Sequence, residues 1–366
     1  MTKLFIPRSE LEHLLNVLKT LGYSTIAPQV KQDAIVFDFI EGVEQLPWGV
    51  EQETAPGRYQ LHHTDKQRCF SWNTGPQLFK PWLFQPTQTL WTGVETEHGI
   101  TFKPAQQDVQ KLAFIGARSC DIAALYLHDQ HFIHGPYADE HYARQRSQIC
   151  IVAVNCSQST QTCFCTSTGD GPEATYGYDV LLDELEEGYL ISAKSPTGNE
   201  IIEKLATQQA KQTHLSMAQQ QLANAANQQR QMPTSEDLQK LTQHLSDDQW
   251  DKIAERCLAC GNCTSVCPTC FCSKQESETD VETGEHGQVR YWDSCFSEQH
   301  AYISGKPIRT AISQHYRQWV LHKLANWQVQ YGRSGCVGCG RCIDWCPAAI
   351  DLVEEVNLML GGEAHD

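Results

Sequence analysis

The chain has 366 residues, with 44 acidic side chains against 28 lysines and arginines, so its formal net charge is −16. This balance argues against a nucleic-acid-binding protein, which needs clustered positive charge, and no apolar run approaches the ~20 residues of a membrane-spanning helix. Seventeen cysteines without an export signal predict metal ligation or redox chemistry in the cytoplasm rather than disulfide bonds.

The N-terminal part begins with a helical pattern. Ser9 starts a capping-box sequence, leucines follow at helical spacing, and Gly22 stands where such a helix would end. Residues 34–40 have the composition of a strand. The Gln-, Thr- and Pro-rich stretch at 41–110 is interpreted as short strands and loops.

The clearest pattern lies between residues 112 and 154. Apolar runs at 112–116 and 149–154 predict buried strands, and helices are expected between them at 121–128 and 138–146. Strand, helix and strand at this spacing predict parallel neighbours in one sheet.

The pattern is weaker further along the chain. Residues 180–186 are interpreted as a helix and 188–194 as a strand. The stretch at 201–232 is rich in Gln and Ala, has few large apolar residues and is interpreted as a weak surface helix or a linker. Helices are expected again at 235–245 and 246–256.

Two cysteine runs with the same spacing follow this linker. The first is Cys257-x-x-Cys260-x-x-Cys263-x-x-x-Cys267-Pro268, and it recurs as Cys336-x-x-Cys339-x-x-Cys342-x-x-x-Cys346-Pro347. This spacing is typical of chains that bind two [4Fe-4S] clusters, where the fourth cysteine of each run ligates the other cluster. Structural zinc instead favours cysteine pairs separated by a longer knuckle. The sequence predicts one cluster on Cys257, Cys260, Cys263 and Cys346, and a second on Cys336, Cys339, Cys342 and Cys267.

The expected fold class combines two kinds of domain. Residues 1–200 are predicted to form an α/β (α+β) domain with a short parallel sheet, and residues 233–366 an α-helical two-cluster ferredoxin domain. The helical type is favoured because a strong helix pattern at 307–327 lies between the two cysteine runs.

Four more cysteines follow the two predicted parallel strands. Cys120 comes just after the first strand, Cys156 after the second, and Cys163 and Cys165 lie on the next loop. The carboxyl ends of parallel strands meet at one edge of a sheet, where such sheets place their ligands. A third [4Fe-4S] cluster is predicted on these four thiols; a group of buried free cysteines is the alternative.

Other cysteines and a basic cluster are interpreted more simply. Three thiols are one short of a full cubane site and are interpreted as structural, with a non-cysteine fourth ligand or packing around a cluster left open: Cys270, Cys272 and Cys295. Cys150 is expected inside a strand, and Cys69 receives no role. Five basic residues near the second run suit either a solvated helix face or charge compensation for anionic clusters: Arg309, Arg317, Lys323, Arg333 and Arg341.

These residues together resemble a known family, which comprises the β subunit of cytoplasmic [NiFe] hydrogenases and sulfhydrogenases and the A subunit of anaerobic sulfite reductase. The segments that carry the resemblance are 116–125, 154–156, 163–165, 177–179, 257–272, 292–295 and 336–347. Phe164 and Phe271, between their cysteine pairs, favour the β-subunit branch.

The resemblance implies a non-catalytic iron–sulfur subunit with no catalytic residues of its own. It would relay electrons between a flavoprotein that handles NAD(P)H and the large and small subunits of a [NiFe] hydrogenase, or a sirohaem subunit in the sulfite reductase case. A self-contained disulfide or polysulfide reductase and a redox- or iron-sensing module are the competing hypotheses.

Overall fold

The computed structural model describes residues 3–97, 99–105, 108–282 and 285–361. Its largest element is a mixed sheet with the strand order β12-β1-β11-β10-β9-β8-β2-β3. Pairing between β10, β9, β8 and β2 is parallel, and the other pairs are antiparallel. The strands are β1 (Leu4–Pro7), β2 (Ser24–Lys31), β3 (Ala34–Phe39), β8 (Leu112–Ala117), β9 (Ile149–Val154), β10 (Val180–Glu184), β11 (Gly188–Ala193) and β12 (Gln208–Gln209).

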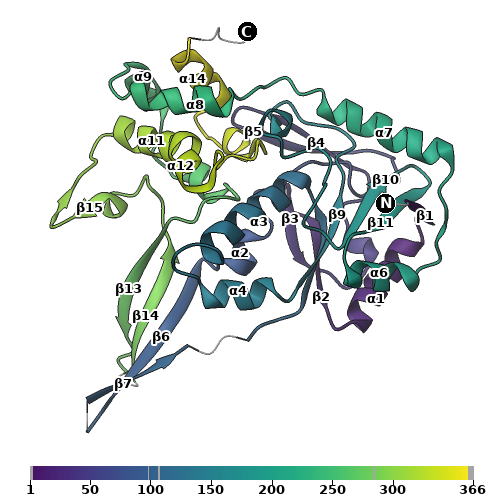
Figure 1. The fold of residues 1–366 in the computed structure, drawn as a ribbon, viewed down its shortest axis with the longest axis horizontal. Helices are drawn as coiled ribbons and strands as arrows, with labels where there is room; N and C mark the ends of the chain where they lie inside the picture. The colour runs from purple at the N-terminus through teal and green to yellow at the C-terminus, as the bar shows by residue number, and fades with distance from the viewer. Residues whose placement is uncertain (1–2, 98, 106–107, 283–284, 362–366) are drawn as a thin grey trace.

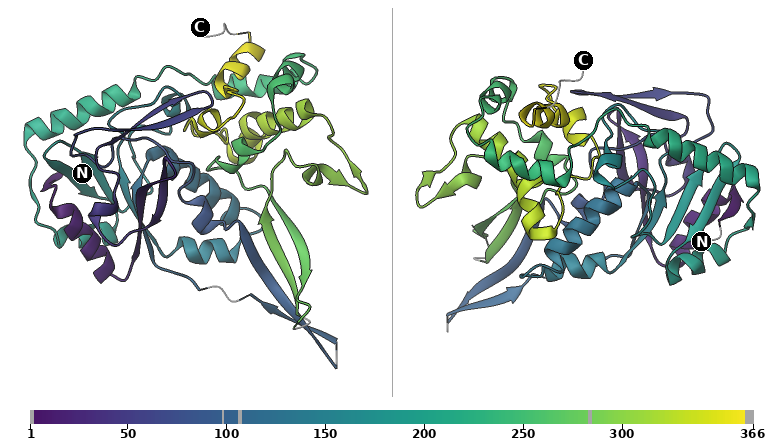
Figure 2. Two further views of the ribbon diagram at one scale, coloured as in Figure 1. Left: turned by 180° about the vertical axis from the view of Figure 1, so that it is seen from behind. Right: turned by 45° about the horizontal axis from the view of Figure 1, so that its top comes forward.

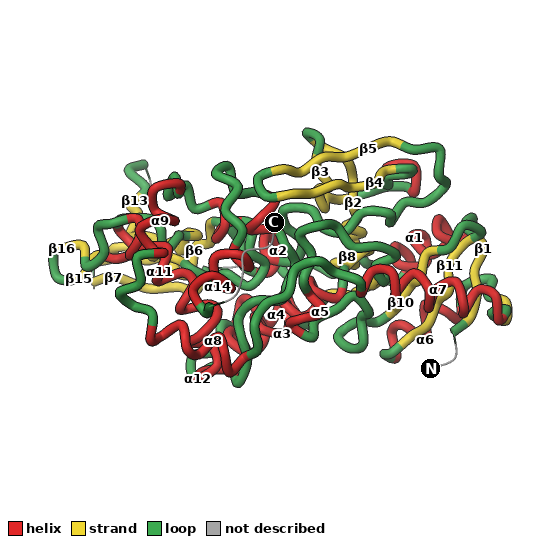
Figure 3. Tube along the Cα trace, turned by 90° about the horizontal axis from the view of Figure 1, so that it is seen from above, coloured by secondary structure: helices red, strands yellow, loops and turns green. Residues whose placement is uncertain are grey.

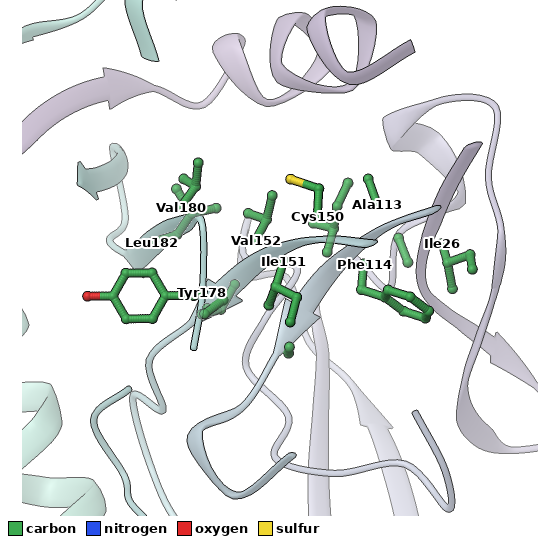
Figure 4. Close-up of a cluster of buried hydrophobic side chains, with 14 of the residues drawn as sticks. Ile26, Ala113, Phe114, Cys150, Ile151, Val152, Tyr178, Val180 and Leu182 are labelled. Atoms are coloured by element: carbon green, nitrogen blue, oxygen red, sulfur yellow. The ribbon is translucent and has the colours of Figure 1, made fainter. Parts of the chain in front are cut away.

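The parallel strands β8 and β9 confirm the predicted strand–helix–strand unit. Every residue of β8 is buried, and Figure 4 shows Phe114 of β8, Ile151 of β9 and Val180 of β10 within the sheet core. Cys150 lies in β9 as expected. The helix expected at 180–186 is wrong, because Val180–Glu184 forms the buried strand β10. The strand is buried on both faces, and its three apolar residues are consecutive, so it lacks the alternation that distinguishes a strand from a helix.

Helices flank this sheet (Figures 1 and 2). The helix expected after Ser9 is confirmed, but the Ser9 side chain makes no capping hydrogen bond, so the predicted capping box does not form. Gly22 takes a φ of 84° after that helix, as expected. The stretch expected as a weak surface helix or a linker contains α7. The helices are α1 (Glu10–Thr20), α2 (Lys80–Leu83), α3 (Ser119–Phe132), α4 (Glu140–Arg146), α5 (Cys165–Thr168), α6 (Pro196–Glu203) and α7 (Gln212–Ala226).

The C-terminal helices gather at the end of the molecule away from the N-terminus (Figure 3). A π-helical segment, Leu321–Asn326, joins α11 to α12 without a break. None of the helices in the described ranges is long and apolar enough to cross a membrane. The helices of this part are α8 (Ser235–Lys240), α9 (Gln249–Arg256), α10 (Asn262–Ser265), α11 (Ile312–Val320), α12 (Trp327–Tyr331), α13 (Arg341–Asp344) and α14 (Leu352–Met359).

A second sheet projects from the body as an arm (Figures 1 and 2). It has the order β13-β14-β6-β7, so strands from between the two cysteine runs pair with strands from the N-terminal part. The segment expected to be helical therefore combines strands with helices. Its strands were missed because they are largely polar, and β14 also pairs with the distant strand β6. The arm consists of β6 (Thr87–Thr96), β7 (Gly99–Pro104), β13 (Ser273–Thr279) and β14 (His286–Trp292), and two hairpins lie elsewhere: β4 (Val50–Ala55) with β5 (Arg58–His63), and β15 (Tyr302–Ile303) with β16 (Lys306–Pro307).

Candidate metal centres

The two cysteine runs form loops of the same shape. Ala259 and Gly261 in the first loop have φ angles of 51° and 75°, and Gly338 and Gly340 in the second have 65° and 77°. Each loop continues into one helical turn, α10 or α13, and these two turns contact each other. The repeated spacing thus corresponds to a repeated backbone conformation, with left-handed residues at matching positions.

Backbone amides in both halves of this repeat reach cysteine sulfurs. The Ala259 nitrogen lies 3.4 Å from Cys257 Sγ, and the Ile350 nitrogen lies 3.4 Å from Cys346 Sγ. Hydrogen bonds to the sulfurs stabilise the thiolate form and help to set the reduction potential of a bound cluster.

The first cysteine group combines both runs. Cys257, Cys260 and Cys263 from the first loop and Cys346 from the second line one cavity. Its remaining wall is largely apolar and includes Phe296, Tyr316, Trp319, Ile350 and Leu352. Cys260 is exposed, and the neighbouring Leu258 is 66% exposed, so this group lies near the surface.

The second group lies deeper and also combines both runs. Burial raises the pKa of the Cys336 thiol to about 12, with further contributions from nearby Cys339 and Cys267. Burial likewise raises the pKa of Cys342, and the neighbouring thiols of Cys336, Cys339 and Cys267 add to the shift. These mutual effects show that the four thiols are neighbours. Cys336, Cys339 and Cys342 are held in sheltered positions that disfavour an isolated thiolate but suit one bonded to iron.

The third group lies at the carboxyl edge of the parallel strands. Cys120 at the start of α3, Cys156 after β9, and Cys163 and Cys165 on the following loop line one cavity. Burial raises the pKa of Cys163 to about 12. The edge that the sequence predicted is therefore where these four thiols come together.

Comparison with known proteins identifies the family of the chain. Residues 256–350, which contain both runs, match the family model described as a 4Fe-4S dicluster domain. Over 269 residues the chain is 31% identical to the sulfhydrogenase 2 subunit beta of Pyrococcus furiosus, covering 68% of this chain and 73% of that protein. The chain belongs to the sulfhydrogenase β-subunit family. No solved structure matches it.

In this member of the β-subunit family, a buried ion pair lies between the second and third groups of cysteines. Arg341 Nη2 is 2.6 Å from Asp121 Oδ1, and the two side chains are 1% and 2% exposed. Arg341 Nε also donates to the Gly75 carbonyl at 2.7 Å. Cys339 and Cys120 are close enough to Arg341 to raise its pKa, although burial, the largest effect, opposes them. Arg341 thus places a positive charge beside thiols of both groups.

The other basic residues near the second run divide between two settings. Lys323 is buried and donates to Thr269 Oγ1 at 2.7 Å. Arg333 pairs with Asp170 at 2.6 Å, whereas Arg317 donates to the backbone carbonyl of Leu245. Charge compensation at the cysteines therefore fits Lys323, Arg341 and Arg333, which also contacts the Cys336 carbonyl at 3.5 Å, rather than the whole cluster.

Sequence reasoning missed polar side chains that contact the third group. Gln228 Nε2 donates to Cys165 Sγ at 3.2 Å, and its Oε1 accepts from the Thr166 nitrogen at 3.1 Å. Thr160 Oγ1 lies 3.2 Å from Cys163 Sγ. Gln228 is one of many glutamines in its stretch, so no pattern distinguishes it.

The remaining cysteines occupy two settings. Cys69 is fully buried, with its sulfur 3.4 Å from the Tyr189 hydroxyl, and Cys150 is buried in β9. Cys270, Cys272 and Cys295 lie together next to the second group. Within the described ranges, no three His, Cys, Asp or Glu side chains form a site for a single metal ion. The thiols of a cubane site bond to different irons and need not converge on one point.

Proposed function

We propose that this chain is a non-catalytic iron–sulfur electron-transfer subunit of a cytoplasmic [NiFe] hydrogenase of the sulfhydrogenase type. It relays electrons between a flavoprotein that handles NAD(P)H and the large and small catalytic subunits. One observation carries the proposal: the three cysteine groups are contiguous. Cys342 of the second group lines the cavity of the first, and Cys339 of the second group lines the cavity of the third.

The proposed ligand sets follow these groups. Cluster one is assigned to Cys257, Cys260, Cys263 and Cys346, cluster two to Cys336, Cys339, Cys342 and Cys267, and cluster three to Cys120, Cys156, Cys163 and Cys165. A bound [4Fe-4S] cluster takes up and releases electrons. The protein supplies thiolates, hydrogen bonds to sulfur, and the buried cations of Arg341 and Lys323, which favour the reduced, more negative state.

The partner assignment is tested by purifying the tagged full-length chain anaerobically from its source cells. The proposal expects a flavoprotein together with [NiFe] large and small subunits. Recovery of a sirohaem subunit would instead identify the A subunit of an anaerobic sulfite reductase. The isolated, reconstituted chain should not evolve hydrogen or reduce sulfite with reduced viologen. Turnover of a disulfide or polysulfide by the chain alone would favour the self-contained reductase.

The third cluster is tested on the full chain by counting iron. Cys120→Ala or Cys163→Ala should each remove about four irons, because each takes one thiol from the same cavity. Cys150→Ala is the matched control, since that thiol is equally buried but lies within a strand. Unchanged iron in the first two variants would mean that these cysteines only fill the core.

A further inference from the structure

Three cysteines outside the proposed ligand sets lie in contact. Cys270 Sγ is 3.8 Å from Cys272 Sγ, and Cys272 packs against the buried cluster that contains Cys295. The arm brings them together, because β13 begins directly after Cys272 and β14 ends just before Cys295. The Asp293 nitrogen donates to the Cys272 carbonyl at 2.9 Å and closes this end of the ladder.

Two buried ammonium groups face these thiols. Lys80 is 5% exposed and Lys323 is 6% exposed, and in the described part of the chain neither forms an ion pair with a carboxylate. Within the described part of the chain, Lys80 Nζ contacts two backbone carbonyls at 3.4 Å and the Trp292 ring at 4.1 Å. Burial lowers the pKa of Lys80, while Cys270, Cys267 and Cys272 act to raise it. A buried cation is costly without a nearby anion, so an anionic group is expected here.

Cys272, the middle residue of the three, also borders open space. It lines an open cavity of about 760 Å³ together with Phe271 and four histidines: His131, His141, His300 and His322. His300 is held by Asp293, with Nδ1 3.0 Å from Oδ2. His322 belongs to the π-helical segment, a backbone form that is frequent at functional sites.

We propose that Cys270, Cys272 and Cys295 hold a fourth [4Fe-4S] cluster, with one iron left without a cysteine ligand and reached from this cavity. Three thiolates around a cubane leave a net negative charge, which offsets the two lysines. Because iron in such a cluster prefers soft donors, the open position would take a small soft anion such as a thiolate. Cys267 of the second group precedes Cys270 by three residues, so the fourth cluster adjoins the relay. The proposal does not depend on which subunits are the partners.

The test counts iron in the reconstituted full-length chain. The double variant Cys270→Ala/Cys295→Ala should lose about four irons per chain and one EPR signal, while the other signals persist. Cys69→Ala, which changes a buried thiol away from every group, is the control and should keep its iron. Full iron in a folded double variant would overturn the proposal. Cys120→Ala distinguishes this loss from failure of the third cluster, because it removes a different signal.

A second measurement needs no variant. Cyanide added to the wild-type protein should change the EPR spectrum of one cluster only, because clusters with four cysteine ligands have no open iron. An unchanged spectrum would rule out the open position, even if the double variant proved unable to fold.

Discussion

At the scale of single residues, Cys346 distinguishes exchanged ligands from ligands taken from one run. Its thiol shares a cavity with Cys257, Cys260 and Cys263. We expect Cys346→Ala to perturb the EPR signal of that cluster in the reduced protein and to leave the signal of the Cys336 run intact. Cys267→Ala is the matched variant and should affect the other signal. If both variants damage the cluster of their own run, the exchange model is wrong.

His128 is expected to make stability depend on pH. It is fully buried in α3, and burial, followed by nearby Lys80, lowers its pKa from 6.5 to about 3. The unfolded chain therefore binds a proton that the folded protein excludes, so stability falls as pH drops from about 6.5 towards 3. Between pH 7 and pH 5 this contributes a loss of about 2 kcal/mol.

We expect His128→Phe to remove that part of the pH dependence. The measurement is the free energy of urea unfolding of wild type and variant, each at pH 7 and pH 5. His62→Phe, at an exposed position on β5, should leave the dependence unchanged. If the free energy of unfolding changed equally with pH in wild type and His128→Phe, the buried His128 would not be the source of the pH dependence.

At the scale of elements, the second cysteine loop lies directly on the loop of the third group. A Cβ atom added at Gly338 would lie 2.5 Å from the Cys165 backbone, and the Phe164 nitrogen donates to the Gly338 carbonyl at 2.9 Å. Gly332 has a similar φ of 70° but open space around it.

We therefore expect Gly338→Ala to lower the unfolding midpoint more than Gly332→Ala and to reduce iron content. Both variants should incur the left-handed cost of about 1–2 kcal/mol, and only the first adds a steric clash. Equal midpoints for the two variants would show that the two loops separate without penalty.

Sequence patterns predicted some of these elements and missed others for physical reasons. The cysteine spacing anticipated the two matching loops, and the apolar runs anticipated β8 and β9 with the thiols at their ends. The same cues failed for β10, which is buried on both faces. They also failed for β13 and β14, whose polar residues show no alternation. The position of this hairpin depends on the pairing of β14 with β6, and a partner so distant in the sequence leaves no local signal.

At the scale of the whole molecule, Arg290 joins the arm to the N-terminal part. Its guanidinium lies 2.6 Å from Asp139, which also caps α4, and the two side chains are 10% and 12% exposed. Replacing Arg290 by Met leaves a buried carboxylate without its partner and should destabilise the protein by about 3–5 kcal/mol. Lys274→Met, in an exposed pair on the same sheet, should leave the urea midpoint unchanged. Matching midpoints for the two variants would argue that the arm is only loosely attached.

Because the Gly338 loop covers Cys165, the order of cluster insertion and chain closure matters for the third cluster that we propose. Cys120, Cys163 and Cys165 are each less than 8% exposed, whereas Cys260 stays at the surface. The third cluster that we propose would require iron and sulfide to reach the inner thiols before the C-terminal part closes over them, whereas the proposed cluster at Cys260 would stay accessible for later insertion or repair. Iron-starved cells should therefore accumulate chains arrested in an open form, which maturation factors and proteases would compete to bind.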